Sequence, residues 1–88
     1  MKLQDLIGKE IVIRTEGNKD LIERLIDECT KMSIKVNKDV CFVNKSYLLI
    51  GKSQLLWGNV NWLCSEISIT EIDELKEKKY EKIRFNSR

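Results

Sequence analysis

The chain has 88 residues, of which 42% are hydrophobic and 34% charged, with no proline, no histidine and a net charge of +2. This length suits a single small domain spanning residues 1–88, and the apolar runs at helix and strand spacing argue against disorder. The composition excludes a collagen, a disulfide-rich scaffold and a membrane span.

The first predicted elements are a helical turn, a strand and an amphipathic helix. Residues 3–7 are expected to form a short turn, and the β-branched run at residues 10–15 predicts a strand. Asn18 is a typical helix N-cap, and the sequence after it predicts a helix over residues 19–32. Its apolar residues recur at the helical period. They are Leu21, Ile22, Leu25, Ile26, Cys29 and Met32.

Short apolar runs then alternate with polar turns, which predicts antiparallel hairpins. An extended piece is expected at residues 34–36, followed by strands at 40–43, 47–50 and 55–57. The uninterrupted run at 47–50 favours a central strand covered on both faces. Residues 66–69 alternate between polar and apolar, so a further strand is expected there.

The C-terminal part predicts a second helix. Thr70 and Asp73 have the spacing of a capping box, and the helix is expected over residues 71–80. Residues 82–85 alternate, which leaves a short last strand and a frayed tail both open.

The element order predicts an α+β fold: an antiparallel sheet of four to six strands, with the first helix packed on one face and a second, C-terminal helix. A ferredoxin-like arrangement is the nearest alternative. Two sets of residues are expected to form the core. The helix contributes Leu21, Leu25, Ile26 and Cys29, and the sheet contributes Ile11, Ile13, Leu49 and Ile67.

The three cysteines, Cys29, Cys41 and Cys64, form no metal-binding pattern. Their number is odd, none belongs to a C-x-x-C pair, and no secretory segment precedes them, so we expect reduced thiols in a cytoplasmic protein. A zinc site built from these thiols with one carboxylate is the minor alternative.

No pattern of catalytic residues is present. Residues 51–53 match the end of a phosphate-binding loop, but position 46 is Ser where the motif needs Gly, and a hairpin is expected there. Acid–base catalysis would have to use groups other than histidine, and no cysteine has an evident base beside it. The sequence therefore predicts a protein that is not an enzyme and uses no cofactor.

Two tryptophans flank the polar turn at residues 58–61 and are the most informative residues. Tryptophan is frequent among binding hot spots, so the turn is a candidate partner-binding site. Its candidate residues are Trp57, Asn59, Asn61 and Trp62. Core packing is the first expectation for the two indoles, since each brings a large buried area to a small core, and stacking on nucleic acid is a third interpretation.

Residues 76–88 carry six Lys and Arg against two Glu, whereas residues 1–75 have a slight acidic excess. A solvated helix end is the first explanation of such a tail, although it also suits phosphates or an acidic partner. The candidate contacts are Lys78, Lys79, Lys82, Arg84 and Arg88.

The opening at residues 1–13 and the strand-to-helix ending at residues 66–75 resemble the small proteins carried by phages and prophages of low-GC Gram-positive bacteria. The Lys-, Ile- and Asn-rich composition is similar too. This resemblance implies a non-enzymatic inhibitor of a host defence protein, of the anti-CRISPR kind. A nucleic-acid or nucleotide-binding module and a structural subunit are the alternatives. A homodimer remains open, and no membrane partner is expected.

Overall fold

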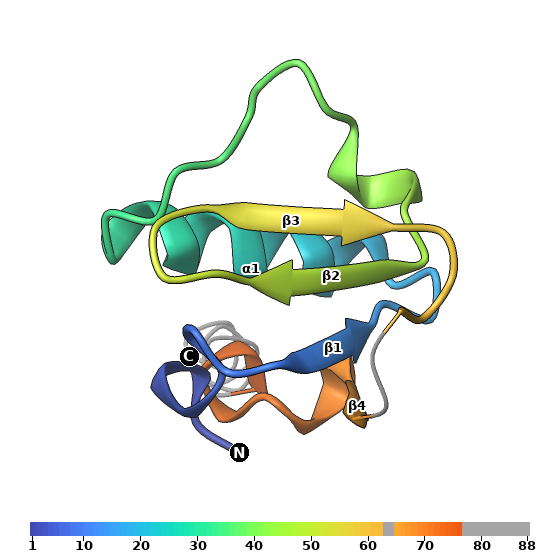
Figure 1. The fold of residues 1–88 in the computed structure, drawn as a ribbon, viewed down its shortest axis with the longest axis horizontal. Helices are drawn as coiled ribbons and strands as arrows, with labels where there is room; N and C mark the ends of the chain where they lie inside the picture. The colour runs from blue at the N-terminus through green and yellow to red at the C-terminus, as the bar shows by residue number, and fades with distance from the viewer. Residues whose placement is uncertain (63–64, 77–88) are drawn as a thin grey trace, which may run out of the picture.

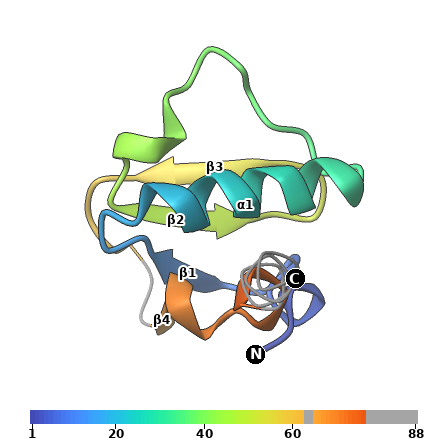
Figure 2. The same ribbon diagram turned by 180° about the vertical axis from the view of Figure 1, so that it is seen from behind.

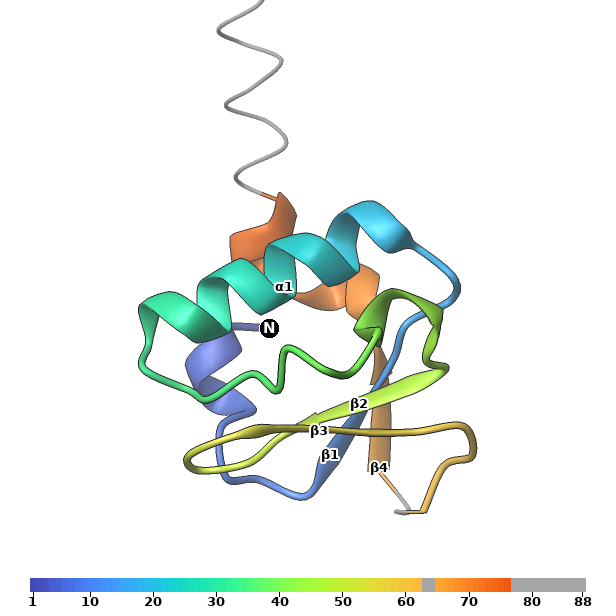
Figure 3. The ribbon, with the colours of Figure 1, turned by 90° about the horizontal axis from the view of Figure 1, so that it is seen from above.

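The computed structural model describes residues 1–62 and 65–76. It is an α+β fold in which a four-stranded sheet, in the order β3-β2-β1-β4, is covered on one face by helix α1. Figure 1 looks onto the uncovered face of the sheet, Figure 2 shows α1 in front of it, and Figure 3 shows the two layers edge-on. Among the described residues no helix is long and apolar enough to cross a membrane.

The helices and strands are short. The strands are β1 (Ile11–Arg14), β2 (Tyr47–Ile50), β3 (Leu55–Gly58) and β4 (Ser65–Ser68), and the helix is α1 (Lys19–Lys31). Three 3-10 turns cover Leu3–Asp5, Phe42–Asn44 and Ile69–Glu71. Residues 73–76 are also helical, which agrees with the start of the predicted second helix, whereas its remaining part lies outside the described residues.

Helix α1 forms as its sequence predicts. The Asn18 side chain accepts a hydrogen bond from the backbone N–H of Leu21 at 3.2 Å and so satisfies one of the free donors of the first turn. Ile22, Leu25 and Cys29 are fully buried against the sheet. Met32 lies just past the helix end and is exposed, so the apolar stripe closes before it.

The face of the sheet toward α1 contains the core. Ile13, Leu48 and Ile50 are fully buried there, and Ile11 and Ile67 are partly buried at its margin. The prediction that Leu49 joins this core is wrong. Leu48 pairs with Ile13, so its neighbour Leu49 points to the opposite face, because side chains alternate along a strand.

The predicted antiparallel sheet is corrected to a mixed one. β1 pairs antiparallel with β2 and parallel with β4, and β2 pairs antiparallel with β3. The strands joined by α1, namely β1 and β2, run antiparallel and therefore form no βαβ unit, which also removes the ferredoxin-like alternative. β2 is central as expected, but only its α1 side is fully buried.

The predicted strand at residues 40–43 is absent. Phe42–Asn44 forms a 3-10 turn that buries Phe42 while leaving Cys41 and Asn44 exposed. One amphipathic turn therefore covers the core here without needing a strand partner. The extended piece at residues 34–36 is reduced to a single parallel bridge between Lys35 and Gln54.

The predicted capping box at Thr70 is also misplaced. Ser68 is the cap: its hydroxyl accepts from the Thr70 N–H, and its own N–H donates to the Glu71 carboxylate at 2.9 Å. The cap lies two residues earlier than predicted and the strand ends one residue earlier, so Ile69 is buried in the following turn rather than in β4.

Candidate docking site at the edge of the sheet

Both tryptophans are on the surface. Trp57 is 42% exposed and Trp62 is 43% exposed, which rejects core packing as their main role. Val60 between them is exposed to 71%, and Asn59 is exposed as well. Phe42, by contrast, is buried, so the two largest side chains of the chain are the ones accessible to a partner.

The two indoles nevertheless lie on opposite faces of β3. Trp57 pairs with Leu48, so it lies on the α1 side of the sheet. Gly58 is the next residue and points the other way, and a Cβ built on it would meet atom Cζ3 of Trp62 at 2.3 Å. Trp62 therefore packs across Gly58 on the uncovered face, and the two tryptophans do not form one patch.

Trp57 is held by a cation. The ammonium nitrogen of Lys45 lies 3.9 Å from the centroid of its ring. A cation over an indole face is attracted by the ring quadrupole, which restricts the indole while its other face stays accessible. Lys45 is half-buried and precedes β2, so the start of one strand of the hairpin positions the indole on the other.

Trp62 has a different support. The Asn61 side chain donates to Glu66 on β4, and Glu66 also pairs with Arg14 of β1. Arg14 in turn pairs with Glu16 at 3.0 Å. Hydrogen bonding from Ser68 and then from Arg14 holds the pKa of Glu16 below its usual value. The turn that carries Trp62 is thus tied to a polar cluster on the uncovered face.

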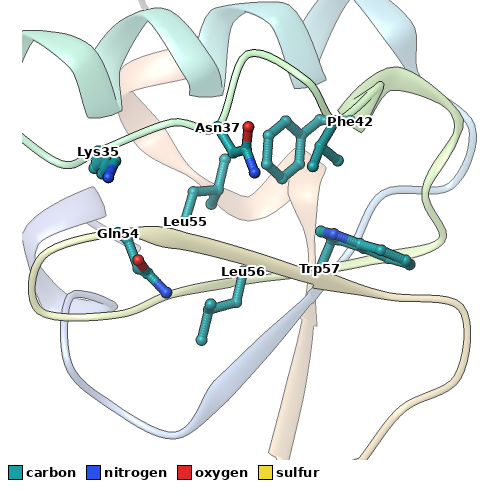
Figure 4. Close-up of a pocket in the computed structure, with 8 residues that line it drawn as sticks. Lys35, Asn37, Phe42, Gln54, Leu55, Leu56 and Trp57 are labelled. Carbon is teal, nitrogen blue, oxygen red and sulfur yellow. The ribbon is translucent and has the colours of Figure 1, made fainter.

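A groove runs between β3 and the segment that links α1 to β2, and we call it the edge groove (Figure 4). Its volume is about 370 Å³. In Figure 4, Leu55 and Phe42 approach each other from the strand and the linking segment, while Leu56 points to the opposite side of the strand. The residues that line the groove are Lys35, Asn37, Val40, Phe42, Gln54, Leu55, Leu56 and Trp57.

The charge among the residues that line the edge groove is positive. Lys35 is the charged residue of its lining, and Lys45 lies against Trp57 at one end. No carboxylate is among the lining residues of the described chain. The groove therefore combines apolar walls, two side-chain amides and a cation, which suits an acidic and partly apolar ligand.

The residues considered for catalysis, metal binding or phosphate binding do not come together in one site in the described part of the chain. Burial raises the pKa of the Cys29 thiol to about 12, which makes it a poor nucleophile, and Cys41 is exposed. No group of three metal-ligating side chains gathers within residues 1–62 and 65–76. Residues 51–53 lie in the β2–β3 turn, as expected, where the Gly51 N–H donates to the Gln54 carbonyl at 2.9 Å.

Several predicted site residues fall outside the described residues. They are Cys64, Lys78, Lys79, Lys82, Arg84 and Arg88. Conversely, sequence reasoning missed Lys35, Lys45 and Phe42, because each reaches the site through long-range pairing. If the hairpin had been predicted with Tyr47 opposite Gly58, Lys45 would have been placed near Trp57, because it lies two residues before Tyr47.

Comparison with models of protein families, with curated proteins and with solved structures finds no match to this chain. Its class is therefore defined by the fold and the surface: a small α+β domain with a partly open sheet edge at β3, an adjoining groove and an exposed, restrained tryptophan. The function is inferred from that geometry.

Proposed function

We propose that this chain is a non-enzymatic binding protein that docks on another protein through Trp57 and the edge groove. One observation carries the proposal: Trp57 is exposed, yet Lys45 lies over its ring and restrains it at the end of a groove. Restrained aromatic residues are effective anchors because little conformational entropy is lost when they are buried at an interface.

The resemblance to small phage and prophage proteins gives the partner class. We propose a host defence protein as the target, bound in the cytoplasm of the host cell and inhibited by occlusion of one of its surfaces. Occlusion needs no catalytic group, since tight burial of a few anchor residues is enough to block access to a site.

The charge distribution supports a protein partner over a nucleic acid for the body of the domain. Residues 1–75 carry more acidic than basic groups. Helix α1 carries exposed Asp20, Glu23 and Asp27, which line a hollow on its own surface together with Arg24, and this excess of acidic groups disfavours a phosphate backbone along the helix. The basic residues 76–88 remain the basis of the alternative, a nucleic-acid or nucleotide-binding module.

The test is a pull-down from host lysate with and without nuclease, followed by affinity measurement on the recovered partner. We expect Trp57→Ala to cost about 2 kcal/mol or more of binding free energy, as hot-spot truncations do. Val60→Ala is the matched control, because Val60 is more exposed than Trp57 and lies in the following turn. It should change the affinity by less than about 0.5 kcal/mol.

A third variant distinguishes protein docking from the alternative, nucleic-acid binding by the tail. Deletion of residues 82–88 should leave protein docking intact, whereas binding of a nucleic acid by the tail would be lost and would weaken steeply with salt. Recovery of nucleic acid alone, and only when the tail is present, would reject the docking proposal.

A further inference from the structure

β3 is an edge strand with backbone groups directed outward. The Leu55 N–H donates to the Lys35 carbonyl at 2.9 Å, on the side away from β2. Backbone polar groups alternate in direction along a strand, so those of Trp57 also point outward while those of Leu56 and Gly58 point to β2. Among the described residues no hydrogen bond to the outward N–H or C=O of Trp57 is formed.

The linking segment occupies this edge only at its beginning. Lys35 donates to the Ser53 carbonyl at 2.8 Å and accepts from Leu55, as a parallel strand would. The chain then turns away at Asn37, whose side chain accepts from the Asp39 N–H at 2.9 Å and whose carbonyl accepts from Val40. The edge groove lies where the segment departs, beside Trp57.

We infer that an extended, acidic segment of the partner protein binds in the edge groove as an added strand on β3. The inference rests on the proposed function and specifies how the partner is held. The segment would pair with the outward N–H and C=O of Trp57 and continue the pairing that Lys35 begins. Addition of a strand to an open sheet edge is a common way to recognise an extended peptide.

The lining sets the chemistry of the segment. Val40, Phe42 and Leu55 form the apolar wall, so one side of the segment is apolar. Lys35 favours carboxylates at the alternate positions, because the two sides of an extended chain alternate. Lys45, which lies against Trp57, favours a further carboxylate at that end of the groove. The chain's own residues 82–85 also alternate but are basic, so charge disfavours a second copy of this chain as the occupant.

The probe is a short capped peptide of alternating glutamate and valine, added to the full-length chain labelled with nitrogen-15. We expect saturable binding below about 1 mM, with slower hydrogen exchange at the Trp57 amide and no change at the Leu56 amide, which already pairs with β2. The same peptide with lysine in place of glutamate should bind about fivefold more weakly, which corresponds to the upper range for one exposed ion pair.

Two pairs of variants separate the contribution of the outward N–H of Trp57 from that of the charge of Lys35. Trp57→Pro and Trp57→Ala both remove the indole, but only proline removes the outward N–H, and an edge strand tolerates proline at such a position. Trp57→Pro should therefore bind the peptide about tenfold more weakly than Trp57→Ala, the value of one hydrogen bond. Lys35→Glu should weaken binding about fivefold. Lys38→Glu, in the same segment but outside the groove lining, should not.

Thermal melts of the two Trp57 variants show whether each is folded. If Trp57→Pro is unfolded, hydrogen exchange at the Trp57 amide of the wild type tests strand addition without that variant. Unchanged exchange at that amide, equal binding of the glutamate and lysine peptides, or self-association of the full-length chain through β3 would overturn the inference. Loss of partner binding in Trp57→Ala combined with unchanged exchange would leave docking in place and reject strand addition alone.

Discussion

The two faces of the sheet are built from the same strands but differ in what they do. On the face toward α1, Ile13, Leu48 and Ile50 are fully buried and fix the position of the helix. On the open face Val12 is fully buried, but Leu49 is half-buried and Leu56 is 36% exposed. Since Leu48 and Leu49 are neighbours of identical type, side-chain type does not decide burial here. The strand register does, because a shift of one residue would exchange the two faces.

The open face also differs in how it is stabilised. Its margin is polar, with Arg14 linking Glu16 and Glu66 across β1 and β4, and with Asn61 donating to Glu66. Exposed ion pairs and hydrogen bonds of this kind contribute little stability but restrict orientation. The α1 face therefore holds the fold together, and the open face holds the turn that carries Trp62.

The largest expected effect is on the free energy of unfolding, which a substitution on the α1 side should lower far more than one on the open face. Leu25→Ala should lower the free energy of unfolding by about 2–5 kcal/mol, because Leu25 is fully buried and its loss leaves a cavity. Leu56→Ala removes the same group from the open face and should cost less than about 1 kcal/mol. Urea denaturation of both variants measures the difference. Equal costs would mean that the open face is also covered in solution.

A smaller effect is expected where Trp62 crosses β3. Gly58→Ala places a Cβ 2.3 Å from the indole, so the ring must move, and we expect a cost of about 1 kcal/mol with a shift in tryptophan fluorescence. Binding through Trp57 should not change, because Trp57 lies on the other face.

A double-mutant cycle sharpens this prediction. In a Trp62→Ala background the added Cβ has no ring to displace, so the cost of Gly58→Ala should fall to near zero. A cost that persists in this background would show that the glycine is needed for its backbone and not for the contact with Trp62.

The sequence predicted those parts of the fold that local signals determine. Helix α1 and its cap at Asn18 were predictable because the apolar stripe and the cap lie within one segment. The parallel pairing of β1 with β4 was not, since it depends on contacts between residues more than fifty positions apart. The strand predicted at residues 40–43 failed for a related reason: a β-branched and aromatic run fits either a strand or a buried turn until its neighbours are known.

The candidate site, like the fold, could be predicted from the sequence only in part. The importance of Trp57 and Trp62 was predictable from residue type alone, but their separation onto two faces was not. It depends on the chain returning across Gly58 after an exposed turn. Lys45 and the edge groove were unpredictable as well, because the hairpin register and the departure of the linking segment at Asn37 create them.

The smallest expected effect concerns the polar cluster of the open face and its dependence on pH. The pKa of Glu16 is lowered from its usual value of 4.5, chiefly by hydrogen bonding from Ser68 and then from Arg14. A carboxylate whose pKa is lower in the folded state contributes stability above its unfolded pKa, and this contribution is lost as the pH falls through the folded pKa. Arg14 stays charged throughout this range.

Glu16→Gln isolates that contribution. Between about pH 5 and pH 7 the wild type should be slightly more stable than the variant, by a constant margin, and the margin should shrink as the pH falls below about 4. Asp20→Asn is the matched control, because Asp20 is an exposed acid in the first turn of α1, away from Arg14. Urea denaturation at several pH values gives both margins. A margin for Glu16→Gln that does not change down to pH 3 would show that the pairs of Glu16 with Ser68 and Arg14 do not persist in solution, and the open face would then be held by Glu66 alone.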